Sequence, residues 1–202
     1  MSESKPERIF FSPDQLENST LPESALNLLR EGLPQSAEIG HTAGVRFAND
    51  LQYAVAESNK PSIRCFAIAY VWERTSEYLV IESVSGEIRA CGPGGEKDVF
   101  VNTDLGSLLD CLSRYSRFQQ RRPSAPEPSI WNAEQARLKL EAFRRGEIRP
   151  KTKADEAARS EAEDRQELQA LKTFLQQKDP ECLKRRESWW SAVLEQLEDR
   201  LV

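Results

Sequence analysis

A proline-rich segment, Arg121-Arg122-Pro123-Ser124-Ala125-Pro126-Glu127-Pro128-Ser129, divides the chain into two parts of different character. Proline lacks a backbone N–H and disfavours helical geometry in the residue before it, so three prolines in nine residues interrupt both helices and sheets. The segment also has almost nothing apolar to bury. We therefore expect an extended connector at 121–129, between a core domain at 1–120 and a second region at 130–202.

Strand patterns dominate the middle of the first part. Four segments are rich in β-branched and aromatic residues or alternate apolar with polar residues, and they lie at 63–71, 77–84, 87–91 and 99–101. The Ser85-Gly86 pair is typical of a tight turn between two of them. Short connections between successive strands favour antiparallel pairing.

A leucine stripe indicates a helix on each side of these strands. The first is predicted to open at Leu21-Pro22-Glu23, with Leu26, Leu29 and Leu33 on one stripe, Thr20 as its N-cap and Gly32 as its stop. The second follows the cap-forming residues 102–104. Helices combined with antiparallel strands predict an α+β fold, in which a twisted, mainly antiparallel sheet packs with helices.

After the connector the patterns are helical. The segments 131–145 and 168–175 carry apolar stripes, whereas 151–167 is so highly charged that it predicts an exposed or frayed helix. Asp179-Pro180 indicates that a new helix begins, with Asp as N-cap and Pro at the first helical position. The last helix contains Trp189 and Trp190, whose side chains point about 100° apart. Either both dock this helix onto the core, as we expect for 130–202, or one belongs to a partner surface.

The charge of the chain is uneven. The formal net charge is −5, but 1–120 holds 11 Lys/Arg and 17 Asp/Glu, whereas 121–202 holds 17 and 16. Nucleic-acid-binding proteins usually show a basic excess, so we expect no direct nucleic-acid partner. No apolar run approaches the ~20 residues of a membrane-spanning helix, and the polar N-terminus does not resemble a secretory signal. These features predict a cytoplasmic protein.

Patterns that would carry catalysis or bind a cofactor are incomplete. His41 is the only histidine, and there is no G-x-S-x-G motif. The four cysteines are scattered without a C-x-x-C pair, which predicts reduced core thiols and no zinc site. The segment from Gly92 to Asp98 resembles a phosphate-binding loop, but Asp98 stands where such a loop needs Ser or Thr. We therefore expect no catalytic residues, no metal and no cofactor.

Several motifs together resemble the SUKH superfamily, in particular its fourth group. Gly32-Leu33-Pro34 is similar to a turn near the start of that family, and 78–115 is similar to its central strands and helix. The ending Asp179-Pro180-x-x-Leu183, followed by Trp189 and Val193-Leu194-Glu195-x-Leu197, resembles the family's C-terminal pattern. The resemblance implies structural roles for Gly32, Leu33, Pro34, Asn102, Asp179, Pro180 and Trp189, with Asn102 as a helix cap.

The resemblance also implies a function without catalysis, as an immunity protein that binds and neutralises a cognate bacterial polymorphic toxin. A nuclease or nucleic-acid deaminase toxin must approach phosphate, so an acidic surface would complement its cleft. The acidic residues predicted to contact the toxin are Glu73, Glu77, Glu82, Glu96, Asp98 and Asp104. An alternative is a regulatory or scaffold protein that uses the same fold as an interaction hub. A hydrolase or nucleotide-binding enzyme is disfavoured, because the sequence offers no clear general base and its phosphate-loop pattern is incomplete.

Overall fold

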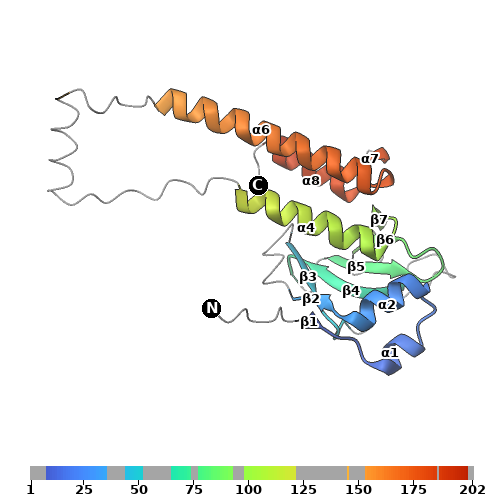
Figure 1. Cartoon of the computed structure of the whole chain (residues 1–202). Coiled ribbons are helices and arrows are strands. Elements are labelled where there is room, and N and C mark those ends of the chain that lie inside the picture. The colour runs from blue at the N-terminus through green and yellow to red at the C-terminus, as the bar shows by residue number, and fades with distance from the viewer. Residues whose placement is uncertain are drawn as a thin grey trace.

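The structure of the chain is a computed structural model (Figure 1). It describes residues 8–35, 44–51, 65–73, 77–92, 98–121, 145, 153–185 and 187–199, with the backbone alone for 153–161. Within them lie six helices, a two-stranded sheet and a five-stranded sheet. This arrangement confirms the predicted α+β fold with C-terminal helices.

The larger sheet is an antiparallel meander in which each strand pairs with the next along the chain. Its strands are β3 (Val45–Phe47), β4 (Cys65–Val71), β5 (Glu77–Glu82), β6 (Ile88–Cys91) and β7 (Asp98–Asn102), in that order. The last four correspond to the four predicted strands, with shifted ends. The short β3 was not predicted, and β1 (Arg8–Ile9) pairs with β2 (Leu33–Pro34) in the smaller sheet.

Both faces of the larger sheet are buried over its central strands. Successive residues of a strand point to opposite faces, so Leu79 and Ile81 of β5 enter the main core, while Tyr78 and Val80 form a smaller cluster with Cys91 of β6. Leu79, Val80 and Ile81 are all fully buried. This double burial explains why β5 is a continuous apolar run in the sequence.

The N-terminal helices are short. Helix α1 (Pro13–Glu17) begins with a capping box at Ser12, and α2 (Glu23–Glu31) follows it. The predicted stop at Gly32 is confirmed, because Gly32 ends α2 with a φ of 87°, but Leu33, predicted on the helical stripe, lies in β2. Thr20 is not the N-cap of α2: Pro22 occupies that position and makes no side-chain capping bond.

The remaining helices form a layered stack with the sheet. Helix α4 (Leu105–Arg121) packs on β7 and α2, and α6 (Lys153–Lys178) lies along α4 on the side away from α2 (Figure 1). The chain then turns back through α7 (Glu181–Lys184) and α8 (Trp189–Glu198), which both contact β7. The segment predicted as exposed or frayed at 151–167 belongs from residue 153 to the single helix α6. Its remaining residues, 151–152, lie outside the described part of the chain.

The helices after the connector share one core with the sheet. Leu171 and Leu175 of α6, and Trp190 and Leu194 of α8, belong to the same buried cluster as Leu79 of β5. Ion pairs add to this contact between α6 and α4, where Arg114 and Arg121 both approach Glu167. Residues 122–129 of the predicted connector and all but Arg145 of the predicted helix 131–145 lie outside the described residues.

Candidate functional site

The described cysteines are suited to packing and not to nucleophilic chemistry. Burial raises the pKa of the Cys91 thiol to about 11 and that of Cys111 to about 12, and it also raises the pKa of Cys65 and Cys182. A thiolate is the reactive form of cysteine, so these thiols stay protonated and unreactive at neutral pH. All four are free of disulfide bonds.

The described residues contain no group of three or more His, Cys, Asp or Glu side chains arranged to hold a metal ion. Two features considered in the sequence lie outside the described residues, namely His41 and positions 93–97 of the segment similar to a phosphate loop, which include Glu96.

The described residues among the predicted toxin contacts are divided between the two ends of the larger sheet. Glu73 is exposed just after β4, and Glu77 begins β5 at the same end of the sheet. Asp104 precedes α4 at the opposite end, where its carboxylate accepts a 2.8 Å hydrogen bond from the backbone N–H of Ser107. At about 3.3 Å per residue, the length of β5 separates the two ends by about 17 Å. Antiparallel pairing places Asp98 at the end that holds Glu77, and Glu82 at the end that holds Asp104.

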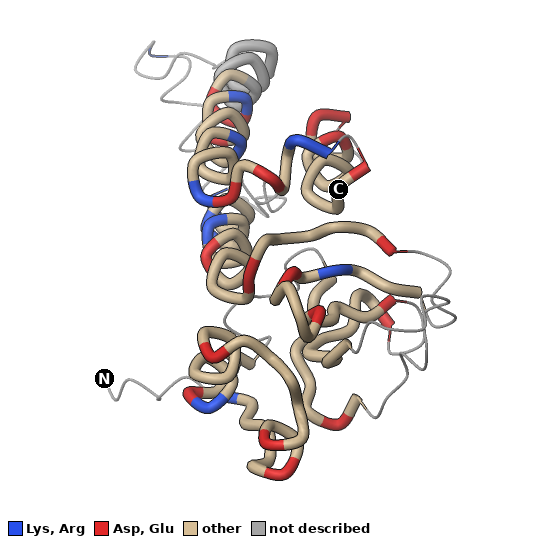
Figure 2. Tube along the Cα trace, turned by 90° about the vertical axis from the view of Figure 1, so that its right-hand side faces the viewer, with Lys and Arg blue, Asp and Glu red and all other residues tan. Residues whose placement is uncertain are grey.

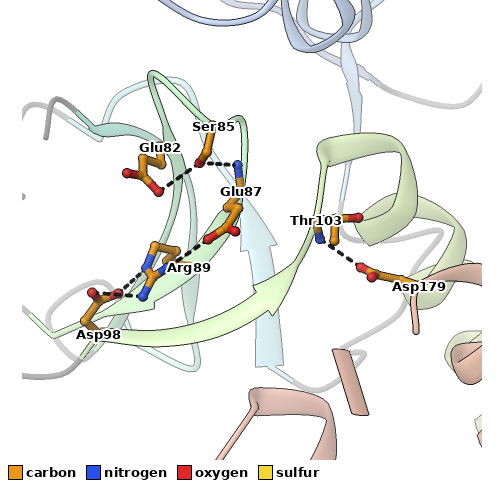
Figure 3. A network of polar contacts seen from close by, with 7 residues as sticks. All are labelled: Glu82, Ser85, Glu87, Arg89, Asp98, Thr103 and Asp179. Atoms are coloured by element: carbon orange, nitrogen blue, oxygen red, sulfur yellow. Dashed lines mark hydrogen bonds and ion pairs between the residues drawn. The ribbon is translucent and has the colours of Figure 1, made fainter. Parts of the chain in front are cut away.

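Arg89 lies between these two ends, where it bonds Asp98 directly and is within range of the charge of Glu82 (Figure 3). Arg89 Nη1 donates to Glu87 Oε2 at 2.9 Å, and Nη2 donates to Asp98 Oδ2 at 3.1 Å while Nε also contacts Asp98. The hydrogen bond to Asp98 raises the pKa of the Arg89 guanidinium, and the charge of Glu82 contributes. Glu82 itself accepts a 2.8 Å bond from Ser85 Oγ. We call these five residues the Arg89 cluster.

The Arg89 cluster holds three carboxylates against one guanidinium, a formal charge of −2. Asp98 and Glu87 are partly neutralised by Arg89, so Glu82 carries the charge least compensated within the cluster. Sequence reasoning missed Glu87 and Arg89, although their alternation with Ile88 and Ala90 places them on the face opposite the main core. The described residues between 44 and 104 contain seven Asp/Glu and two Arg, whereas basic and acidic residues are interspersed along α4 and α6 (Figure 2).

A buried polar network joins β7 to the C-terminal helices. Asp179 Oδ2 accepts 2.8 Å hydrogen bonds from Asn102 Nδ2 and from the backbone N–H of Thr103, and Trp190 Nε1 donates to Asn102 Oδ1 at 3.0 Å (Figure 3 shows Thr103 and Asp179). Asn102, Asp179 and Trp190 are almost completely buried. Asn102 therefore links β7 to the C-terminal helices. It was predicted as the cap of the helix that follows β7, but the cap of that helix, α4, is Asp104.

The other residues assigned structural roles by resemblance take specific positions. Gly32, at a φ of 87°, has Phe10 so close that a Cβ would lie 2.8 Å from its ring. Leu33 is buried and Pro34 half-buried in β2. The predicted N-cap at Asp179 was wrong: α7 begins at Glu181, so Pro180 is its N-cap, and the Asp179 carboxylate accepts bonds from Asn102 and Thr103 instead. Trp189 is half-buried and packs edge-on against Trp190 at 4.9 Å, while Trp190 is the buried member of the pair.

Trp72, which the sequence analysis did not select, is a surface feature of a different kind. Its side chain is 63% exposed, and its φ of 63° is in the left-handed region that bulky residues rarely adopt. The backbone N–H of Trp72 donates to the Gly44 carbonyl at 2.8 Å. The indole rests on Gly44, where a Cβ would lie only 2.5 Å from Trp72 Cδ2. No sequence pattern distinguishes this exposed Trp from a buried one at the end of a strand.

In the described part of the chain, no helix combines the length and the apolar character needed to cross a membrane. No curated protein and no solved structure shows significant similarity to the chain. The model of one protein family, described as SUKH-4 immunity protein, matches residues 6–196. That match includes the sheet, the Arg89 cluster and the network around Asn102 and Asp179, so the chain belongs to the SUKH-4 immunity protein family.

Proposed function

We propose that this protein binds and neutralises a cognate bacterial polymorphic toxin with nuclease or nucleic-acid deaminase activity, by covering the toxin's active site. The family match supports an immunity role. The observation that carries the choice of toxin class is the acidic excess on the sheet, centred on the Arg89 cluster. The protein then acts in the cytoplasm, by protein–protein contact alone, without catalysis and without binding nucleic acid.

The physical basis of the proposal is electrostatic complementarity. An enzyme that acts on nucleic acid needs a basic cleft to hold phosphates, and a folded acidic surface can occupy the same cleft. Residues 44–104 hold nine Asp/Glu and six Lys/Arg in the sequence, and the described sheet positions Glu82, Glu87 and Asp98 on one face. Such a surface speeds encounter with a basic partner and repels nucleic acid.

The first test is a binding and inhibition assay with the toxin domain encoded beside this gene. The inactivated toxin should bind at nanomolar concentration, and a stoichiometric amount of this protein should stop the active toxin. Raising the salt concentration from 0.05 M to 0.5 M should slow association strongly, because exposed charges are screened within about 10 Å at 0.1 M. Absence of a complex at micromolar concentration would overturn the proposal.

A charge variant tests where the toxin binds. The double variant Glu82→Gln and Glu87→Gln removes two carboxylates and leaves Arg89 bonded to Asp98, so association should slow about tenfold or more. Glu17→Gln, on the exposed surface of α1, serves as a matched control and should leave the rate unchanged. Equal rates for all three proteins would show that the Arg89 cluster does not face the toxin.

A further inference from the structure

Trp72 holds a position that the fold itself does not favour. A left-handed backbone conformation is free of strain for glycine and tolerated by asparagine, but it costs free energy for a residue with a bulky side chain. The structure nevertheless places the largest side chain there, with a φ of 63°. A smaller residue would suit this turn better, so folding alone does not account for the tryptophan.

The exposed indole is also held in one place. The indole lies on the backbone of Gly44, which has a φ of 74°. The main-chain N–H of Trp72 donates a hydrogen bond to the Gly44 carbonyl. A side chain fixed before binding loses little conformational entropy when it is buried by a partner. Tryptophan is among the residues most enriched at the energetic centres of protein interfaces, and such anchors are ringed by polar groups.

The surroundings of Trp72 define the partner's chemistry. Glu73 follows it directly and is exposed, and Glu77 begins the next strand, opposite Val71. The whole segment 44–104 has three more acidic than basic residues. The matching partner surface is an apolar pocket rimmed by Lys or Arg, as in a protein that binds nucleic acid.

We infer that Trp72 is the aromatic anchor by which this protein binds its toxin. The indole inserts into an apolar pocket beside the toxin's basic cleft. This inference rests on the proposed function and adds the residue at the centre of the contact. The two features have different kinetic roles: the charge of the Arg89 cluster speeds association with the toxin, and burial of the Trp72 indole slows dissociation.

The test compares the affinity of variants for the inactivated toxin domain encoded beside this gene. Trp72→Gly relieves the left-handed strain, so its melting temperature should match or exceed that of the wild type, while its affinity should fall about 30-fold or more. Phe10→Ala is the matched control, because Phe10 is also an exposed aromatic, 56% accessible, that rests on a glycine of positive φ. The control should bind within threefold of the wild type.

Each outcome separates this inference from the proposed function. If the wild type binds and Trp72→Gly binds within threefold of it, the anchor is refuted while the immunity role stands. Equal losses for Trp72→Gly and Phe10→Ala also refute the anchor. A dimer of this chain that Trp72→Gly dissociates without weakening toxin binding would assign the indole to self-association instead. If the wild type itself fails to bind, the proposed function fails and the anchor fails with it.

Discussion

Replacing Asp179 with alanine should loosen the C-terminal helices from the sheet. The carboxylate accepts hydrogen bonds from Asn102 Nδ2 and Thr103 N, both at 2.8 Å, and it stands at the junction of α6 and α7. Alanine leaves both donors without this acceptor, and Asn102 is completely buried. The damage should therefore spread from one side chain to the contact between β7 and α8.

The size of the effect follows from two opposing contributions. Hydrogen bonds to a charged group are worth about 1.5–3 kcal/mol each, so losing two costs about 3–6 kcal/mol. The other oxygen, Asp179 Oδ1, is buried without a hydrogen-bond partner, and removing it returns about 1–3 kcal/mol. We expect a net loss of about 2–4 kcal/mol, or a melting temperature lowered by about 5–15 °C for a chain of this size.

Urea unfolding followed by tryptophan fluorescence measures this loss, and hydrogen exchange locates it. Asp110→Ala is the control, since it removes an exposed carboxylate that pairs with Lys178 of α6 and should cost less than about 1 kcal/mol. In Asp179→Ala, amide exchange should accelerate in α6 and α8 before it does in β5. A midpoint for Asp179→Ala equal to that of Asp110→Ala would refute the reasoning that this network holds the two parts together.

Three further outcomes follow from the structure. Gly44→Ala should lower the free energy of unfolding by about 1–3 kcal/mol in a thermal melt, because Gly44 has a positive φ and an added Cβ would collide with the Trp72 indole. The control Gly106→Ala, in α4, should change the free energy of unfolding by less than about 1 kcal/mol. Equal effects of the two substitutions would contradict this expectation. Because burial raises the thiol pKa of Cys91 and Cys111, these protonated thiols contribute fully to the stability of the folded chain below pH 9. That contribution is lost as the pH rises toward 11–12, by about 1 kcal/mol per thiol and pH unit. Urea midpoints that are equal at about pH 8 and about pH 10.5 would contradict this expectation. A chain of residues 1–121 should show no cooperative melt by circular dichroism, because α6 and α8 complete the core; a sharp transition would show that it folds alone.

The strands and α4 were predictable because local patterns decide them. Alternation and short turns place β4 to β7 in sequential antiparallel order, with errors only at the strand ends. The stop of α2 at Gly32 was predicted correctly, but Leu33 was placed on its stripe, since Leu33 fits a helical stripe and a buried strand equally well. The cap of α4 was assigned to Asn102, because three consecutive residues, 102–104, all have capping side chains.

The sequence by itself determined strands β4 to β7, helix α4 and the acidic excess of the first 120 residues, since these depend on neighbours along the chain. Only the tertiary structure decided that Asp98 and Glu87 both bond Arg89, that Glu73 and Asp104 lie at opposite ends of the sheet, and that Asp179 reaches Asn102 across 77 positions. It also decided which tryptophans are buried, leaving Trp72 exposed and Trp190 enclosed. The physical reason is that burial and charge pairing depend on segments distant in the chain, which local patterns do not encode.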